Sequence, residues 1–234
     1  SSGLGVAFAK ALAEAGADVA IGARRVERLE ETSALVRAAG RRAVAVATDV
    51  AKPEDCERLV AAAVDELGGV DILVNNAGIG AAVPSTRETP EEFRAVVDVN
   101  LNGCYWMAQS FARAATRGGS IVNIGSILGL TTAGLPQAAY SASKAALVGL
   151  TRDLAQQWTA RKGIRVNCIA PGFFASEMSD QYLPGYLESI MPRVLMGRKG
   201  DPEALAATLV WLVSGAGGYV TGQTIAVDGG VTIT

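Results

Sequence analysis

The sequence contains no histidine, and this absence narrows the chemistry open to the chain. Without imidazole, Ser-His-Asp catalysis and most catalytic zinc sites are excluded. Cysteine is also scarce: Cys56, Cys104 and Cys168 are odd in number and far apart, so they form neither a disulfide framework nor a zinc knuckle. We interpret them as buried thiols and expect no metal site. Proton transfer must then fall to tyrosine, lysine, aspartate or glutamate.

The sequence also lacks an excess of basic residues. The 234 residues carry a formal net charge of -2, and lysine and arginine are scattered without runs, which argues against a nucleic-acid surface. No apolar run is long enough to span a bilayer. We therefore expect a small-molecule partner, no membrane contact and a cytoplasmic location. A hydrophobic content of 50% suits one compact domain over residues 1–234.

Short apolar segments alternate with longer amphipathic segments along the chain. The apolar segments predict strands of about five residues, and the amphipathic segments predict the helices that link them. This alternation is typical of right-handed β-α-β units, and hence of an α/β fold with a doubly wound parallel sheet covered by helices on both faces. Such sheets bind ligands at the carboxyl ends of their strands. The expected strands cover residues 18–22, 44–47, 70–74, 120–124, 164–169 and 224–227.

The first residues resemble the end of a phosphate-binding turn. They are Ser1, Ser2, Gly3, Leu4 and Gly5, and a helical pattern follows them. Glycines in such a turn let backbone N–H groups approach a pyrophosphate at a helix N-terminus, where the helix dipole favours negative charge. A flexible tail is the alternative. Because the strand that should precede the turn is missing, we expect the native polypeptide to extend upstream of Ser1 by a strand and a glycine.

A run of two asparagines, an alanine and a glycine, Asn75 to Gly78, follows one expected strand. Small residues there allow close approach of the backbone, and asparagine side chains can tie the loop to a neighbouring strand; a simple turn is the alternative. Further on, Thr89 and Glu92 predict a capping box for one long helix that ends before residue 118. Asn100 lies inside this helix, where asparagine has poor helix propensity, so we consider a polar role for it.

Tyr140 and Lys144 are four residues apart on an expected helix, so their side chains project from the same face. A nearby ammonium favours a phenolate, and Lys144 is therefore expected to bring the pKa of Tyr140 towards the range useful for acid-base catalysis. The alternative for this pair alone is a solvated helix face. Ser126, at the end of the strand over residues 120–124, would by itself be only a loop serine.

Together these motifs resemble the short-chain dehydrogenase/reductase family over essentially the whole chain. They occur in the family's order: Gly3-Leu4-Gly5, Asn75-Asn76-Ala77-Gly78, Asn100, Ser126, Tyr140 with Lys144, and Pro171-Gly172. The resemblance implies a Rossmann-type single domain and hydride transfer between a nicotinamide cofactor and a ketone or secondary alcohol.

The resemblance also implies the roles of the catalytic residues. Ser126 would hold the substrate oxygen, Tyr140 would exchange its proton, and Lys144 would bind the nicotinamide ribose and support the phenolate. Asn100 would position a water in the proton relay. The interval from Ser126 to Tyr140 is one residue longer than the commonest family spacing, in a loop of variable length.

The remaining cofactor contacts follow from the same resemblance. Those near adenosine would be Asp49, Val50, Asn76, Ala77 and Gly78. Those near the nicotinamide would be Pro171, Gly172, Phe174 and Ser176. The segment over residues 173–196 would cover the substrate, and its apolar residues, Tyr182, Leu183, Tyr186 and Leu187 among them, suggest a substrate with hydrophobic character, although core packing is an equal alternative for each.

The cofactor choice depends on the turn after the strand over residues 18–22. An NAD enzyme generally has an acid here, which would repel a 2′-phosphate, but this chain has Ala23 followed by Arg24 and Arg25. A guanidinium binds phosphate through two parallel charge-assisted hydrogen bonds. We therefore expect NADP(H) to be preferred over NAD(H), with Arg24 the principal contact.

We predict an NADP(H)-dependent ketoreductase that assembles as a homodimer or homotetramer. A 3-oxoacyl thioester reductase is the main alternative within the enzyme class. A non-catalytic nucleotide-binding or regulatory protein on the same fold is the competing class, and it would be expected to lack Ser126, Tyr140 or Lys144.

Overall fold

The computed structural model describes residues 3–175 and 185–234. Its strands are parallel and form two sheets, one of β1 and β2 and one in the order β3-β4-β5-β6. The expected parallel α/β fold is therefore confirmed. Over the described residues, β1 and β3 do not pair with each other. The strands are β1 (Val19–Ala23), β2 (Ala43–Ala47), β3 (Ile72–Asn75), β4 (Gly119–Ile124), β5 (Ile164–Pro171) and β6 (Thr224–Val227).

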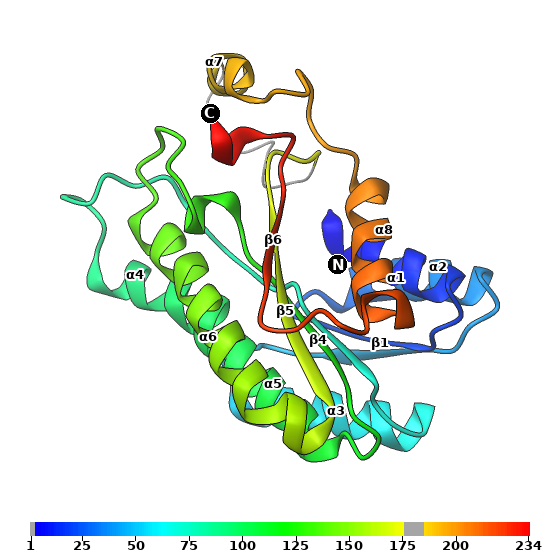
Figure 1. The fold of residues 1–234 in the computed structure, drawn as a ribbon. Helices are drawn as coiled ribbons and strands as arrows, with labels where there is room; N and C mark the ends of the chain where they lie inside the picture. The colour runs from blue at the N-terminus through cyan, green and yellow to red at the C-terminus, as the bar shows by residue number, and fades with distance from the viewer. Residues whose placement is uncertain (1–2, 176–184) are drawn as a thin grey trace.

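Helices cover both faces of the sheets (Figure 1). On one face, Ile121 of β4 packs with Phe111 of α5 and with residues of α3 and α6. On the other face, the adjacent Val122 packs with Phe8 of α1 and Leu209 of α8. This alternation follows from the two-residue period of a strand. The α-helices are α1 (Leu4–Glu14), α2 (Val26–Ala38), α3 (Pro53–Leu67), α4 (Pro90–Val97), α5 (Gly103–Ala114), α6 (Ala138–Lys162), α7 (Tyr186–Ile190) and α8 (Pro202–Val213).

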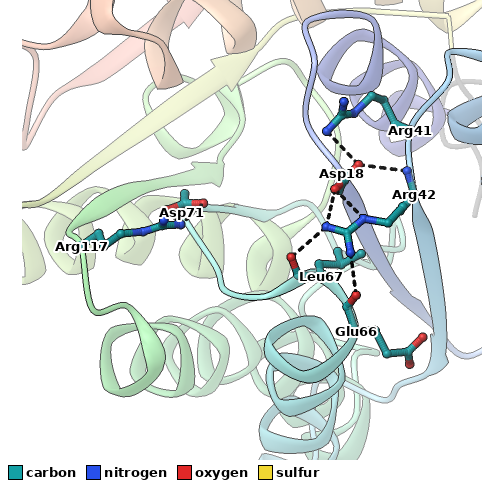
Figure 2. A network of polar contacts seen from close by, with 7 residues as sticks. All are labelled: Asp18, Arg41, Arg42, Glu66, Leu67, Asp71 and Arg117. Carbon is teal, nitrogen blue, oxygen red and sulfur yellow. Dashed lines mark hydrogen bonds and ion pairs between the residues drawn. The ribbon is translucent and has the colours of Figure 1, made fainter.

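A polar network fixes the amino-terminal ends of β1 and β2 against the end of α3 (Figure 2). Asp18 accepts hydrogen bonds from the backbone and side chain of Arg42 at 3.0 and 2.8 Å, and it forms an ion pair with Arg41. The Arg42 guanidinium also donates to the Glu66 and Leu67 carbonyls, which α3 leaves without helical partners. These bonds to Arg42 hold the pKa of Asp18 below 3.8.

The long helix expected after Thr89 is present and ends before residue 118, because α4, a π-helical turn and α5 follow one another without a break from Pro90 to Ala114. The predicted capping box is confirmed, because Thr89 and Glu92 exchange side-chain and backbone hydrogen bonds. The π-helical turn between α4 and α5, η1 (Asp98–Asn102), was not predicted. Such turns are rare and frequently lie at functional sites. Here the turn contains Asn100, the poor helix former noted in the sequence.

The three cysteines are free and buried, as expected. Burial raises the pKa of Cys56 and of Cys104 to about 11, so these thiols stay protonated at neutral pH. The short helix α7 has no counterpart in our sequence prediction. None of the helices in the described ranges is both long and apolar enough to cross a membrane.

Candidate active site

A cleft of about 1000 Å³ lies along β1 and β3 and the loops that follow the strands. It gathers the described residues that the sequence predicted to be catalytic or cofactor-binding, apart from Asn100. They are Gly3, Leu4, Gly5, Arg24, Arg25, Asp49, Val50, Asn76, Ala77, Gly78, Ser126, Tyr140, Lys144, Pro171, Gly172 and Phe174. Ser1, Ser2 and Ser176, together with Tyr182 and Leu183, lie outside the described residues.

Tyr140 and Ser126 lie together at one part of this cleft. Ser126 precedes the short 3₁₀ helix η2 (Ile127–Gly129), and its hydroxyl oxygen accepts a hydrogen bond from the Leu128 backbone at 3.1 Å. The Ser126 O–H thus remains a donor that can hold a ligand oxygen. Burial raises the pKa of Tyr140, and the hydrogen bond with Ser126 lowers it by less. A protonated Tyr140 is suited to act as an acid.

Lys144 is almost completely buried, with 4% of its surface exposed. Its ammonium group donates to the Ile124 carbonyl at 2.7 Å and lies 5.7 Å from the centre of the Tyr140 ring. Burial lowers the pKa of Lys144, because removing the ammonium group from water disfavours its charged form. The lowering of the Tyr140 pKa that we expected from Lys144 is wrong for this structure, since burial of the phenol dominates.

Asn100 joins the loop after β3 to the helix that carries Tyr140. Its amide accepts from the Ile79 backbone N–H at 2.8 Å and donates to the Ile79 carbonyl at 2.9 Å. It also donates to the Ser143 hydroxyl at 3.0 Å, and Ser143 in turn donates to the Tyr140 carbonyl at 2.7 Å. Asn100 is fully buried. Its observed role is therefore to align two segments, while the water relay stays a prediction.

The start of α1 lines the cleft, and its backbone can accept the phosphates of a dinucleotide. Gly3 caps this helix with a positive φ of 59°, which favours glycine, and no side chain caps the helix by a hydrogen bond. The first turn of α1 also contains no acidic residue. A Cβ on Gly5 would meet the Asn76 side chain at 2.8 Å, so only glycine leaves the turn and the Asn75–Gly78 loop this close. The helix N-terminus is thus open to an anion.

The two arginines of the predicted 2′-phosphate site follow β1 directly. Both line the cleft and are exposed, and Arg25 is the residue that precedes α2. Asp49 also lines the cleft, where its carboxylate accepts the Ala51 N–H at 3.2 Å in a local turn. No acidic side chain occupies the Ala23 position at the end of β1.

Sequence reasoning missed three residues beside Tyr140. Gly80 lies against the ring: a Cβ there would come within 2.6 Å of it. Ser143 connects Asn100 to α6, and Gln137 lines the cleft one turn before Tyr140. For Gly80, the available signal was its place two residues after the Asn75–Gly78 run, where a further glycine follows. Nothing in the sequence around Ser143 or Gln137 indicates a functional position before the fold is known.

An apolar cluster adjoins this part of the cleft. Phe173 packs with Tyr186 in an edge-to-face contact at 6.2 Å, and Tyr140 packs against the same cluster. The Tyr186 hydroxyl donates to the Ala133 carbonyl at 2.8 Å, which fastens α7 to the loop after η2. The cluster consists of Ile127, Leu128, Ala133, Phe173, Ile190, Val194 and Val231, with Tyr140, Tyr186, Leu187 and Met191 packed against it.

Comparison with known proteins agrees with this geometry. A family model described as enoyl-(acyl carrier protein) reductase matches residues 1–232. The chain is 40% identical to a 2-dehydro-3-deoxy-D-gluconate 5-dehydrogenase of Dickeya dadantii, over 98% of this chain and 91% of the relative. It is 40% identical to a galactitol 2-dehydrogenase of Cereibacter sphaeroides (99% and 92%) and 36% identical to a 3-oxoacyl-[acyl-carrier-protein] reductase of Vibrio cholerae (99% and 93%).

Solved structures give the same result. A putative short-chain alcohol dehydrogenase from Sinorhizobium meliloti superposes with a TM-score of 0.95 at 40% identity, covering 100% of this chain and 93% of the other. A short-chain dehydrogenase from Burkholderia cenocepacia in complex with NADP gives 0.93 at 35% identity, covering 98% and 94%. The chain belongs to the short-chain dehydrogenase/reductase family. It is an oxidoreductase that acts on CH–OH groups, in a family that uses nicotinamide cofactors.

Proposed function

We propose that this protein is an NADP(H)-dependent ketoreductase that interconverts a ketone and a secondary alcohol. The observation that carries the proposal is the convergence of Ser126, Tyr140 and Lys144 in one cleft, where Asn100 anchors the helix bearing Tyr140. The reduced cofactor would supply a hydride to the carbonyl carbon. The chain's own residues bind and orient both reactants and supply the proton.

The proton step follows from the surroundings of Tyr140. The Ser126 O–H holds the substrate oxygen, and the Tyr140 phenol donates its proton to that oxygen as the alcohol forms. Lys144 lies close enough to favour the phenolate that remains, and its ammonium is also available to a ribose hydroxyl. Reduction is the direction we favour, because the raised pKa of Tyr140 keeps the phenol protonated at neutral pH.

The preference for NADP(H) rests on Arg24 and Arg25, which line the cleft where β1 ends without an acid. The Burkholderia cenocepacia structure in complex with NADP supports this cofactor. The Vibrio cholerae relative, named as a 3-oxoacyl-[acyl-carrier-protein] reductase, makes an acyl thioester the second candidate substrate. Simple ketones and 3-oxoacyl thioesters should therefore be assayed side by side with NADPH and NADH.

The test is the Tyr140→Phe variant, assayed by nicotinamide absorbance. The variant keeps the ring but removes the exchangeable proton, so kcat should fall by a factor on the order of 10² or more while the cofactor still binds. Tyr219→Phe is the matched control, because Tyr219 is fully exposed and should tolerate the change. A kcat for Tyr140→Phe close to that of the control would refute the assignment.

A further inference from the structure

Gln137 is a lining residue of the cleft that contains Tyr140, and its side-chain oxygen is not used by the fold. It precedes α6, and its backbone carbonyl accepts the Ser141 N–H at 2.9 Å, so its position is fixed by the start of the helix. Its side-chain oxygen, Oε1, is buried and has no hydrogen-bond partner in the described part of the chain. Gln137 is the N-cap residue three positions before Tyr140, and both residues line the cleft, so this oxygen and the Tyr140 phenol belong to the same binding site.

A buried acceptor without a partner lowers stability, and it is therefore uncommon unless a ligand uses it. Four other buried polar atoms of the described residues share this state. Those of Ser33, Ser120 and Thr224 do not line the cleft, and Arg41 lies beside Asp18 at the opposite ends of the strands. Gln137 is the member of this set that lies beside the proposed catalytic group.

The surroundings of Gln137 restrict what can bind. Ile127, Leu128 and Phe173 line the cleft and belong to the apolar cluster against which Tyr140 packs, so they provide an apolar wall near the phenol. The other charged residues lining the cleft, apart from Lys144, follow β1 and β2 or lie at the amino-terminal ends of β1, β2 and β3. They are Asp18, Arg24, Arg25, Arg41, Asp49 and Asp71. The described carboxylates and arginines of the cleft are thus on other segments than Tyr140, and Gln137 offers the substrate a neutral acceptor.

We propose that Gln137 determines specificity by accepting a hydrogen bond from a substrate hydroxyl next to the reacting carbonyl. The substrate class is then an uncharged hydroxyketone, or the corresponding vicinal diol in the reverse direction. This inference rests on the proposed function, since it takes Tyr140 to mark the carbonyl position. The apolar wall accommodates the carbon skeleton, and the amide distinguishes a hydroxylated substrate from its deoxy analogue.

The test compares Gln137→Leu with the unmodified enzyme on ketone pairs that differ by one hydroxyl, such as 3-hydroxybutan-2-one and butan-2-one, with NADPH. Loss of the acceptor should lower kcat/KM for the hydroxyketone about 10- to 100-fold and leave the plain ketone nearly unchanged. Gln137→Glu keeps an acceptor and should keep the preference. Gln156→Leu, an exposed site on α6, is the matched control.

Thermal unfolding without substrate gives an independent readout. Replacing an unpaired buried acceptor by an apolar group should raise the unfolding midpoint of Gln137→Leu by about 2–4 °C, because the group is kept for the ligand and not for the fold. Three results would overturn the inference. They are a lower unfolding midpoint for Gln137→Leu, an equal loss of kcat/KM on both ketones of a pair, and loss of the preference for the hydroxyketone in Gln137→Glu as well. An unmodified enzyme that reduces no ketone would instead overturn the proposed function, and the midpoint would still decide the role of Gln137.

Discussion

Thr151→Val should destabilise the protein, although the change keeps the shape of the side chain. The Asn123 amide donates to the Thr151 hydroxyl at 3.0 Å, and its oxygen accepts from Asn75 at 2.9 Å. Asn75 also donates to the Cys104 carbonyl at 3.1 Å. These bonds join β3, β4, α5 and α6 inside the molecule, where Asn123 and Thr151 are both 0% exposed.

The magnitude follows from the N–H group that the change leaves without an acceptor. Valine cannot accept the Asn123 hydrogen bond, and an unsatisfied buried donor costs about 1–3 kcal/mol. For a chain of this size, that loss lowers the unfolding midpoint by about 2–4 °C per kcal/mol. Because Thr151 does not line the cleft, kcat of the folded enzyme should stay close to that of the unmodified protein.

Urea denaturation measures this cost. The midpoint should fall while the m-value stays the same. Thr208→Val is the matched control: Thr208 is half-buried on α8, and its hydroxyl donates to the Ala204 carbonyl at 3.2 Å in a solvent-exposed hydrogen bond, so its replacement should change the free energy of unfolding by less than about 0.5 kcal/mol. If Thr151→Val costs no more than Thr208→Val, the buried network does not stabilise the fold as we argue.

Three further predictions address the cofactor, pH and assembly. Arg24→Ala should weaken NADPH binding about 10- to 100-fold and hardly affect NADH binding. The control variant, Arg161→Ala on α6, should affect the binding of neither cofactor. An equal loss of affinity for both cofactors in Arg24→Ala would contradict the 2′-phosphate contact. The pKa of Asp18 is lowered in the folded protein, so its carboxylate contributes stability that is fully present above pH 3.8 and is lost as the pH falls below 3.8 through the lower folded-state pKa. Asp18→Asn should therefore destabilise the protein at neutral pH, and the difference should shrink below pH 3.8; a difference independent of pH would argue against it. Sedimentation should show a homodimer or homotetramer, because α6 exposes the small residues Ala142, Ala145 and Gly149, and a monomer at micromolar concentration would refute this.

Local patterns in the sequence predicted much of the fold. The last strand, β6, has the expected bounds of residues 224–227, because its apolar residues are followed by glycines that mark its end. The spacing of Tyr140 and Lys144 predicted that both lie on one helix. Ser126 lines the same cleft because the carboxyl ends of parallel strands lie at one edge of a sheet. These features depend on neighbouring residues or on a general rule of topology.

The remaining features depend on contacts between distant segments. Asn75 and Asn123 meet because β3 and β4 pair in a register that brings them opposite each other, which no local pattern indicates. The raised pKa of Tyr140 depends on burial against residues far away in the sequence, Phe173 and Ile190 among them, and the unpaired oxygen of Gln137 is recognisable only once the cleft is known. The π-helical turn adds one residue to an otherwise regular pattern, and the sequence marked it only through the poor helix propensity of Asn100.

That turn also determines where this helical segment can change in length. Each residue of an α-helix advances the chain by about 100° around the axis, so deletion of one residue from within α5 would rotate the rest of that helix by this angle. Met107, Ala108 and Phe111 of α5, which are buried against the sheet, would then turn away from the core. The Asp98–Asn102 turn holds one residue more than a regular α-helix, so loss of one residue there would restore the α-helix and leave the buried face of α5 in place. Between Thr89 and Ala114, single-residue deletions are therefore expected to be accepted at this turn and not elsewhere.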